Sequence, residues 1–576
     1  MMLAIGAAVL AGRDVLQAGA RSPSSSAPSY SMVVRSSGQC LNIVGGSTDA
    51  GAATEQNICD GRASERFSPV QNANGTWAIR NANSALCLDS GASTTSGAAV
   101  VQAACGSSVS QRWNLRSLAD GSYSFVTHDG QGCINVFQGA SWAGAPVITW
   151  ACLGGSNEKF DVAGFYGRYQ LPPSSGNSAL VAGMVSHNLD AGSLGGIQQS
   201  GAKSLRTPFY WSEVEAVCGQ YEIPAATSAL VSNELALGIT PQALLFYNNA
   251  CYDGGSYPQS SAGIQAYADY AAYVAAQAPQ AQYFEIYNEW TNFADRSGLS
   301  NAQQSYMNLL EVAGPAVKTA RSSAIVLADE AVLGDKSPEL MQKLAAAGAF
   351  AWFDGLVLHP YVYQGYPQGA SPEAFRAYLQ EMENNVAMAA GKSVDIYVTE
   401  AGWPVGGIGG KVTEDLQASY SSRMYILART LPFLKMLELY EYRDSCTDAS
   451  SPECHFGLLR ADGSVRPAGY AYRDTLPFLD GRQYVSQLVS ATPSVMALEF
   501  VDAAGVRSIA MWSADDLTYK VTLTTSRAVR SGQVQIVTVG AGSTTVPASS
   551  RLDLTVTARP MLITGFVSST ATVQVQ

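Results

Sequence analysis

The pattern of apolar and polar positions divides the chain into three parts. Up to about residue 163, short β-type runs alternate with turns rich in Gly and Ser, and the pattern repeats. Equivalent cysteines recur every 46 or 47 residues: Cys40, Cys87 and Cys133, then Cys59, Cys105 and Cys152. One unit of this length cannot bury its apolar face alone, so we expect three units to share a core. The aromatic residues at matched offsets would form that core: Phe67, Trp113 and Phe160.

Past residue 163, apolar strand runs alternate with Ala-rich helical stretches, among them 262–277, 302–320, 338–347 and 373–390. Strands are expected at Ala182–Ser186, Ser204–Thr207, Ala243–Tyr247, Tyr283–Tyr287, Ala324–Ala328, Gly355–Leu358, Asp395–Thr399 and Met436–Tyr440. Strands and helices that alternate in this way over residues 164–480 predict a parallel (β/α)8 TIM barrel.

From about residue 481 the helical pattern stops. β-branched runs separated by turns follow at Val495–Val501, Arg507–Trp512, Tyr519–Thr524, Gln533–Thr538 and Leu552–Thr557. Residues 481–576 are therefore predicted to form a small antiparallel β-sandwich. The expected fold class is multidomain, with a repeat domain at 29–163, a barrel at 164–480 and this sandwich.

Composition excludes several classes of function. With 34 basic and 46 acidic residues, the net charge is −12 at pH 7, which disfavours a nucleic-acid partner. None of the four His has a neighbour at zinc-motif spacing, so we predict no metal site and no cofactor. Hydrophobic residues make up 47% of the chain and charged residues only 14%, a composition that excludes intrinsic disorder.

The N-terminus has the features of a targeting segment. Its apolar run, 1–12, is too short to span a bilayer, and Ala18-Gly19-Ala20 resembles a cleavage site. We interpret residues 1–28 as a signal peptide and linker, although the charged start is missing; the alternative is a frayed tail. Ten Cys, an even number, suit an oxidising compartment, so we expect a secreted monomer without a membrane span.

Cysteine pairs inside the repeat units would staple each unit. The repeats resemble a ricin B-type lectin β-trefoil (carbohydrate-binding module family 13), with Gln111-Arg112-Trp113 as the family's Q-x-W. The resemblance implies a sugar site in each unit. The third unit fits best, with Asn135, Trp150 and Asn157, although Asn135 stands where the family has an acidic residue. The first unit has Asn42 at the same position, and the second has Ala103 at the aromatic position. A purely structural trefoil is the alternative.

In the barrel, polar residues follow the predicted strands. Active sites of this fold lie at the C-terminal ends of the strands, and two glutamates stand there: Glu289 after the fourth strand and Glu400 after the seventh. Cleavage of a glycosidic bond needs two carboxyl groups, one protonated and one ionised. These two glutamates are therefore the candidate pair. Glu285 and Glu330 also lie near strand ends, and we interpret both as members of structural ion pairs. Arg443 and Asp444, after the eighth strand, are expected to pair with each other.

The runs Phe284-Glu-Ile-Tyr-Asn-Glu-Trp290 and Ile396-Tyr-Val-Thr-Glu-Ala-Gly-Trp-Pro404 resemble those of retaining glycoside hydrolases built on this barrel. Leu205-Arg206, Trp211–Glu215 and Leu439–Asp444 are similar to glycoside hydrolase family 39, which includes β-xylosidases, α-L-iduronidases and bacterial exopolysaccharide hydrolases. The resemblance covers about 300 residues.

This resemblance implies roles for individual residues. Glu289 would be the acid/base and Glu400 the nucleophile, with Asn288 on the substrate's 2-hydroxyl. Arg206 would keep Glu400 ionised, because a nearby cation lowers a carboxyl pKa. The remaining candidates would shape the pocket of the attacked sugar: His187, His359, Tyr361 and Trp403.

We therefore expect a secreted retaining glycoside hydrolase of the β-xylosidase or exopolysaccharide hydrolase type. It would cleave a poly- or oligosaccharide by double displacement, with the trefoil as a substrate anchor. The alternative is a lectin-like carbohydrate-binding protein with an inactive barrel. The presence of Glu289, Glu400, Asn288 and Arg206 together favours the enzyme. The sequence does not identify the sugar or its linkage.

Overall fold

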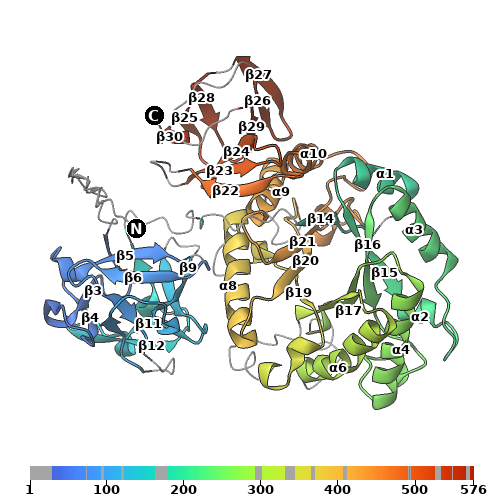
Figure 1. Ribbon diagram of the computed structural model, residues 1–576, viewed down its shortest axis with the longest axis horizontal. Coiled ribbons are helices and arrows are strands. Elements are labelled where there is room, and N and C mark those ends of the chain that lie inside the picture. Colours follow the sequence, from blue (N-terminus) through green and yellow to red (C-terminus); the bar gives the residue numbers. More distant parts are fainter. Residues whose placement is uncertain are drawn as a thin grey trace, which may run out of the picture.

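A computed structural model describes residues 29–575 except 73, 92–96, 119–121, 163–170, 172–179, 188, 292–300, 331–343, 365–369, 407–411, 489, 491, 493, 526–532, 548 and 566–570. The predicted fold class is confirmed: a trefoil, a parallel barrel and antiparallel C-terminal sheets follow one another along the chain (Figure 1). The expected signal peptide, 1–28, lies outside the described residues, as does most of the expected helix 338–347.

The N-terminal domain is a 13-stranded antiparallel arrangement. Its strands are β1 Tyr30–Ser31, β2 Val33–Val34, β3 Cys40–Ile43, β4 Thr54–Asn57, β5 Arg66–Gln71, β6 Trp77–Asn81, β7 Cys87–Asp89, β8 Val101–Ala103, β9 Trp113–Ser117, β10 Tyr123–Thr127, β11 Gly132–Val136, β12 Ala145–Ala151 and β13 Phe160–Asp161. Each unit contains its own disulfide: Cys40–Cys59, Cys87–Cys105 and Cys133–Cys152. Phe67, Trp113 and Phe160 are fully buried in one shared core, which confirms the expectation from the repeat.

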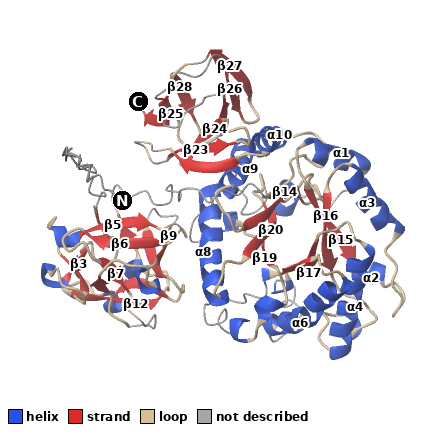
Figure 2. Ribbon diagram, in the orientation of Figure 1, coloured by secondary structure: helices blue, strands red, loops and turns tan. Residues whose placement is uncertain are grey.

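The second domain is a closed barrel of eight parallel strands surrounded by helices (Figure 2). The strands are β14 Val181–Met184, β15 Ser204–Tyr210, β16 Thr240–Phe246, β17 Tyr283–Ile286, β18 Ile325–Ala328, β19 Gly355–Leu358, β20 Asp395–Ala401 and β21 Leu434–Leu439. The helices are α1 Ala191–Gln199, α2 Trp211–Val214, α3 Ala225–Ala236, α4 Ser261–Gln277, α6 Ala302–Ala320, α8 Pro372–Ala390, α9 Glu414–Ala428 and α10 Pro467–Leu479.

The third and fourth barrel strands end one residue earlier than the apolar pattern predicts, for a reason visible in the backbone. Tyr247 and Tyr287 were expected as the last residues of the third and fourth strands, but their φ angles are +61° and +71°. These values lie in the left-handed region, which is incompatible with a strand. β16 and β17 therefore end at Phe246 and Ile286, and the chain turns sharply where the candidate site begins.

The C-terminal domain contains more strands than the β-branched runs indicate: β22 Gln483–Gln487, β23 Val495–Val501, β24 Arg507–Ser513, β25 Tyr519–Thr525, β26 Gln533–Thr538, β27 Gly542–Pro547, β28 Arg551–Val556, β29 Met561–Thr564 and β30 Ala571–Val575. They form a 6-stranded and a 3-stranded sheet. The period of 2 along β23 separates its two faces. Met496 and Leu498 pack with the barrel core, whereas Val495 and Ala497 pack between the two sheets. Strand β23 is thus buried on both faces and attaches the larger sheet to the barrel.

Helix α8 lies between the trefoil and the barrel strands (Figure 1). On the trefoil side, Glu381 pairs with Arg116, and Asn384 donates to Asn114 at 2.9 Å. Near its N-terminus, the same helix contacts the sandwich, because Trp512 Nε1 donates to Glu373 Oε1 at 2.9 Å. No helix in the described part of the chain is long and apolar enough to cross a membrane.

Candidate active site

The two candidate glutamates lie at the same mouth of the barrel. Glu400 is near the end of β20, and Glu289 comes three residues after β17. One carboxylate oxygen from each, together with a ring nitrogen of His359, lie within 4.8 Å of one another. Their side chains are 21% exposed for Glu289 and 11% for Glu400, so both remain accessible from the mouth. The structure thus brings the predicted pair together across the barrel.

Backbone strain marks the turn that presents Glu289. Its φ angle is +45°, and Tyr287 in the same turn is also left-handed. Such conformations cost non-Gly residues about 1–3 kcal/mol each and persist only where the surroundings enforce them. Here the Tyr287 hydroxyl donates to Asn248 Oδ1 at 2.6 Å, and the Tyr287 amide donates to the Leu245 carbonyl at 3.2 Å. The turn is therefore held from β16 and keeps the Glu289 side chain over the mouth.

Arg206, in β15, is the cation of the site and is 4% exposed. Its Nη1 pairs with Glu400 Oε1, as the sequence predicted. Its Nε and Nη2 donate to both oxygens of Glu285, at 3.0 and 2.6 Å. Burial lowers the pKa of Arg206, but Glu285 and Glu400 raise it more, so the net shift is upward and the guanidinium stays charged. The expected structural ion pair of Glu285 is confirmed.

Asn288 and Tyr361 complete the contacts around Arg206 and Glu400. Asn288 Oδ1 accepts from Arg206 Nη2 at 2.6 Å, which leaves the amide hydrogens of Asn288 as its donors to a substrate. The Tyr361 hydroxyl donates to Glu400 Oε2 at 2.7 Å. Glu400 therefore receives hydrogen bonds on both carboxylate oxygens, one from Arg206 and one from Tyr361. This arrangement fixes the carboxylate in one orientation.

His359 lies between the two glutamates. Its Nδ1 is 3.0 Å from Glu289 Oε1 and 3.9 Å from Glu400 Oε2, and its Nε2 is 2.9 Å from Thr399 Oγ1. Burial lowers the pKa of His359, but the charge of Glu400 and the hydrogen bond to Glu289 outweigh burial and raise it to about 9. The ring is therefore protonated at neutral pH.

The same cluster has the spacing of a metal site. Glu289, His359 and Glu400 each offer one ligand atom at mutual distances within 4.8 Å. A metal ligand must be a deprotonated imidazole, however, and His359 is charged at neutral pH. Binding of a cation here would therefore have to displace the proton of His359.

His187 lies on another side of the mouth, and its side chain is 54% exposed. Its Nδ1 is 2.9 Å from Glu441 Oε2, and this hydrogen bond raises the pKa of His187. Its ring meets Tyr440 edge to face at 5.6 Å. Tyr440 in turn contacts Tyr361 at 6.1 Å, so His187 belongs to the same wall of aromatic side chains as Tyr361, which donates to Glu400.

Trp403, also predicted to shape the pocket, is 2% exposed. Its Nε1 donates to the Ala370 carbonyl at 2.7 Å, and its ring packs edge to face on Tyr420 at 5.5 Å. It lies in the barrel core and offers almost no surface to a ligand. Its role in shaping the pocket stays a prediction, and any such effect is indirect.

One expected pair near strand eight is wrong. Arg443 and Asp444 were interpreted as partners, but Asp444 Oδ2 pairs with Arg466 Nη2 at 2.7 Å, and Arg443 Nη2 lies 3.5 Å from Asp190 Oδ2. Neighbours in sequence at a strand end point in different directions, so adjacency does not predict a contact.

Sequence reasoning missed two residues beside the glutamates. Thr399 connects His359 to Glu285, at 2.9 and 3.5 Å. Tyr247 exposes 37% of its surface after β16. Thr399 was visible as the polar residue before Glu400, but Tyr247 looked like the apolar end of a strand, and nothing in the sequence revealed its left-handed φ.

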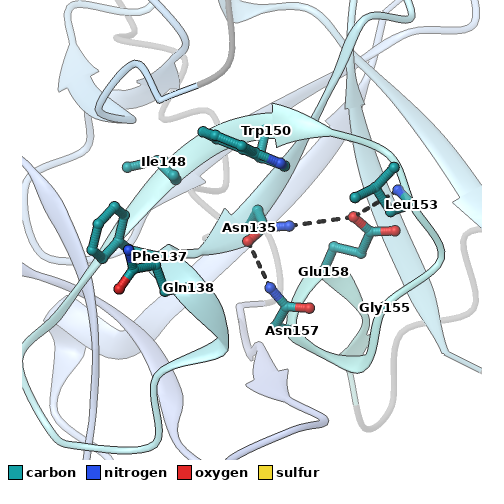
Figure 3. A pocket seen from close by; sticks show the side chains of 9 residues that line it. All are labelled: Asn135, Phe137, Gln138, Ile148, Trp150, Leu153, Gly155, Asn157 and Glu158. Atoms are coloured by element: carbon teal, nitrogen blue, oxygen red, sulfur yellow. Dashed lines mark hydrogen bonds between the residues drawn. The ribbon is translucent and has the colours of Figure 1, made fainter.

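The predicted lectin residues line one cavity of about 310 Å³ in the third trefoil unit (Figure 3). Asn157 Nδ2 donates to Asn135 Oδ1 at 2.8 Å, and Asn135 Nδ2 donates to Glu158 Oε2 at 3.3 Å. Trp150 is 42% exposed above these amides. An exposed ring over fixed amide groups is the arrangement in which a sugar ring stacks while its hydroxyls are bound.

A comparison with known protein families identifies the type of the N-terminal domain. Residues 20–103 and 90–150 match the ricin-type beta-trefoil lectin domain-like family. The N-terminal domain is thus a lectin-like trefoil. A search of curated protein sequences gave no match.

Three solved structures illustrate what this chain is similar to. A family 39 glycoside hydrolase from the gut symbiont Bacteroides cellulosilyticus WH2 is 18% identical, with 91% of this chain and 99% of that chain covered and a TM-score of 0.56. An α-L-arabinofuranosidase from Thermotoga maritima is 13% identical over 69% of this chain and 98% of its own, with a TM-score of 0.48. The designed threefold symmetric protein ThreeFoil is 28% identical over 24% and 99%, with a TM-score of 0.23. At 18% identity, the first of these likenesses shows a shared fold.

Proposed function

We propose that this protein is a secreted retaining glycoside hydrolase that cleaves a poly- or oligosaccharide by double displacement. The observation that carries the proposal is the proximity of Glu289 and Glu400, whose nearest ligand atoms lie within 4.8 Å. Retaining enzymes separate their carboxyl groups by about 5–5.5 Å, whereas inverting enzymes need about 6.5–9.5 Å to admit a water. The short separation supports retention.

In the first step, a Glu400 oxygen attacks the anomeric carbon while the bond to the leaving oxygen breaks. Glu289 gives its proton to that oxygen, so the sugar leaves as a neutral alcohol. In the second step, water attacks the same carbon, its proton passes to Glu289, and Glu400 departs as a carboxylate. The hydrogen bonds from Arg206 and Tyr361 hold the Glu400 carboxylate in one orientation before attack.

The finer assignments rest on resemblance and on the rest of the molecule. The motifs shared with glycoside hydrolase family 39 support a β-xylosidase or exopolysaccharide hydrolase type. Five disulfides, Cys218–Cys251 and Cys446–Cys454 among them, support secretion into an oxidising compartment. The exposed Trp150 supports substrate anchoring by the trefoil.

Glu289→Gln tests the acid role. Activity on natural glycosides with poor leaving groups should fall by about 10²–10⁴-fold, because only these need a strong acid. Activity on aryl glycosides with activated leaving groups should fall far less. The measurement is kcat/KM on both substrate types after a screen of aryl glycosides and plant or bacterial polysaccharides. Equal loss on both types contradicts the assignment, and azide should partly restore Glu289→Ala.

A further inference from the structure

Opposite the nucleophile, the mouth has a second aromatic wall, made by Tyr210, Phe246 and Tyr247. Tyr210 and Phe246 are the last residues of β15 and β16, and their rings lie 5.3 Å apart. The Tyr247 ring stacks on Phe246 with an interplanar angle of 26° and meets Tyr287 edge to face at 6.3 Å. Tyr247 is the most exposed member, at 37%. None of the roles proposed above uses it.

The segment after Tyr247 is firmly anchored. Cys251 forms a disulfide with Cys218, and Asn249 Nδ2 donates to the Glu215 carbonyl at 2.9 Å. The Tyr252 hydroxyl donates to Glu215 Oε1 at 2.6 Å. Tyr247 itself has a φ of +61°, an unusual conformation for a bulky aromatic residue. A ring held at the mouth in a strained backbone by a fixed loop is a common feature of ligand sites.

The strand order locates Tyr247 relative to the reaction. β16 pairs directly with β17, after which Glu289 follows, and it lies four strands from β20 in the closed barrel of eight, opposite Glu400. Tyr247 also contacts the turn that presents Glu289, because its ring meets that of Tyr287 edge to face. The acid/base acts at the glycosidic oxygen, between the attacked sugar and the leaving one. A residue beside Glu289 and opposite Glu400 therefore lies on the side of the leaving group.

We propose that Tyr247 is a specificity-determining residue whose exposed ring stacks against the sugar of the leaving group. This inference rests on the proposed function and identifies the preferred substrate class: glycosides whose leaving group is itself a pyranose ring, as in a disaccharide or a polymer. A flat aromatic face gives apolar contact to the C–H face of such a ring, and binding energy from this remote part of the substrate is used at the reacting centre.

The test compares two substrates of the same sugar and anomeric configuration, a disaccharide and a glycosyl fluoride. Fluoride has no ring to stack, so it reports on the chemistry without the leaving-group site. Tyr247→Gly, which fits the left-handed φ, should lower kcat/KM on the disaccharide about tenfold or more and change the fluoride less than about twofold. Tyr247→Phe, which keeps the ring, should retain most of the disaccharide activity.

Two controls isolate the ring from the backbone change. Ala85→Gly places glycine at another residue with a positive φ, +60°, in the trefoil, and so tests the backbone change alone. Tyr470→Ala removes a 51% exposed tyrosine from α10, and so tests the loss of an exposed ring elsewhere in the barrel domain. Both should leave both substrates unchanged. Equal losses on fluoride and disaccharide with Tyr247→Gly, or no loss on either, overturn the proposal. If the parent enzyme hydrolyses neither substrate for any sugar screened, the proposed function itself fails, and that result is visible before any variant is made.

Discussion

At the residue scale, the site depends on the ratio of buried cations to buried carboxylates inside the barrel. The barrel interior contains Glu285, Glu400 and Glu438 around the one buried Arg206. Arg206 contacts the first two, whereas Glu438 accepts from Ser204 Oγ at 2.8 Å. Burial raises the pKa of Glu438 to about 8, so this group is neutral at pH 7. Arg206 is thus left to Glu285 and to the nucleophile.

His359 makes the stability of the protein depend on pH. Its pKa is raised from 6.5 to about 9 in the folded protein. A raised histidine pKa stabilises the fold fully below pH 6.5, and this stabilisation is lost as pH rises through about 9. From pH 6 to pH 9.5, the parent should therefore lose on the order of 3 kcal/mol more stability than His359→Gln. Urea unfolding at both pH values measures the difference, because other titrating groups are common to both proteins. Parallel losses in the two proteins would show that His359 is not charged in the fold.

Sequence analysis found a site residue when two features could be recognised: a side chain with suitable chemistry and a position at the end of a predicted strand. Glu289 and Glu400 satisfy both conditions. Tyr247 was missed because its role depends on a backbone angle that no pattern of apolar positions encodes. Trp403 was predicted to shape the pocket because it is close to Glu400 in sequence. Three residues after Glu400, however, the chain has already entered the core, and the Trp403 ring is buried there.

At the scale of the element, α8 joins the domains. Glu373, in its first turn, accepts from Trp512 Nε1 at 2.9 Å and from Arg423 Nε at 3.1 Å. Arg423 is fully buried and also pairs with Asp516 at 2.7 Å. The sandwich is thus attached to the barrel by hydrogen bonds to Glu373 and Arg423.

Glu373→Ala should therefore destabilise the barrel–sandwich body by about 3–5 kcal/mol, because it leaves the buried charge of Arg423 with less compensation. Asp553→Ala is the control, since it removes a carboxylate from an ion pair whose side chains are 59% and 57% exposed. That change should cost less than about 1 kcal/mol. Thermal unfolding of the variants measures both. A similar small effect for both would show that Glu373 is not a structural link.

Elements were predictable where their period was uninterrupted. Ala302–Ala320 and Val495–Val501 have the bounds that the apolar pattern gave. The pattern did not reveal β27 and β30, because β27 is mostly exposed and β30 is short and polar on one face. Packing against neighbouring strands, and not their own composition, makes these segments strands.

At the scale of the whole molecule, the trefoil contacts the barrel through polar groups on the outside of α8, such as the Arg116–Glu381 pair. None of the contacts described for the catalytic pair comes from the trefoil. In the proposed function, the trefoil would raise the local concentration of the barrel on the same polymer chain.

Deletion of residues 29–163 should leave cleavage of small soluble glycosides nearly unchanged and weaken action on long or insoluble substrates. Trp150→Ala should reproduce most of that loss, because it removes the exposed ring over Asn135. Pull-down on candidate polysaccharides, with kinetics on both substrate sizes, measures the effect. Trp142→Ala, at a 57% exposed tryptophan outside the cavity, is the control. Unchanged polymer binding by Trp150→Ala excludes the third unit as the site, and loss of small-substrate cleavage on deletion would make the trefoil part of the catalytic body.

Double displacement by Glu289 and Glu400 is tested most directly by the configuration of the first product. Proton NMR during the hydrolysis of an aryl glycoside distinguishes the two anomers before they equilibrate. Because the ligand atoms of the pair lie within 4.8 Å, the first sugar released should have the same anomeric configuration as the substrate. A first product of opposite configuration would contradict a covalent intermediate on Glu400.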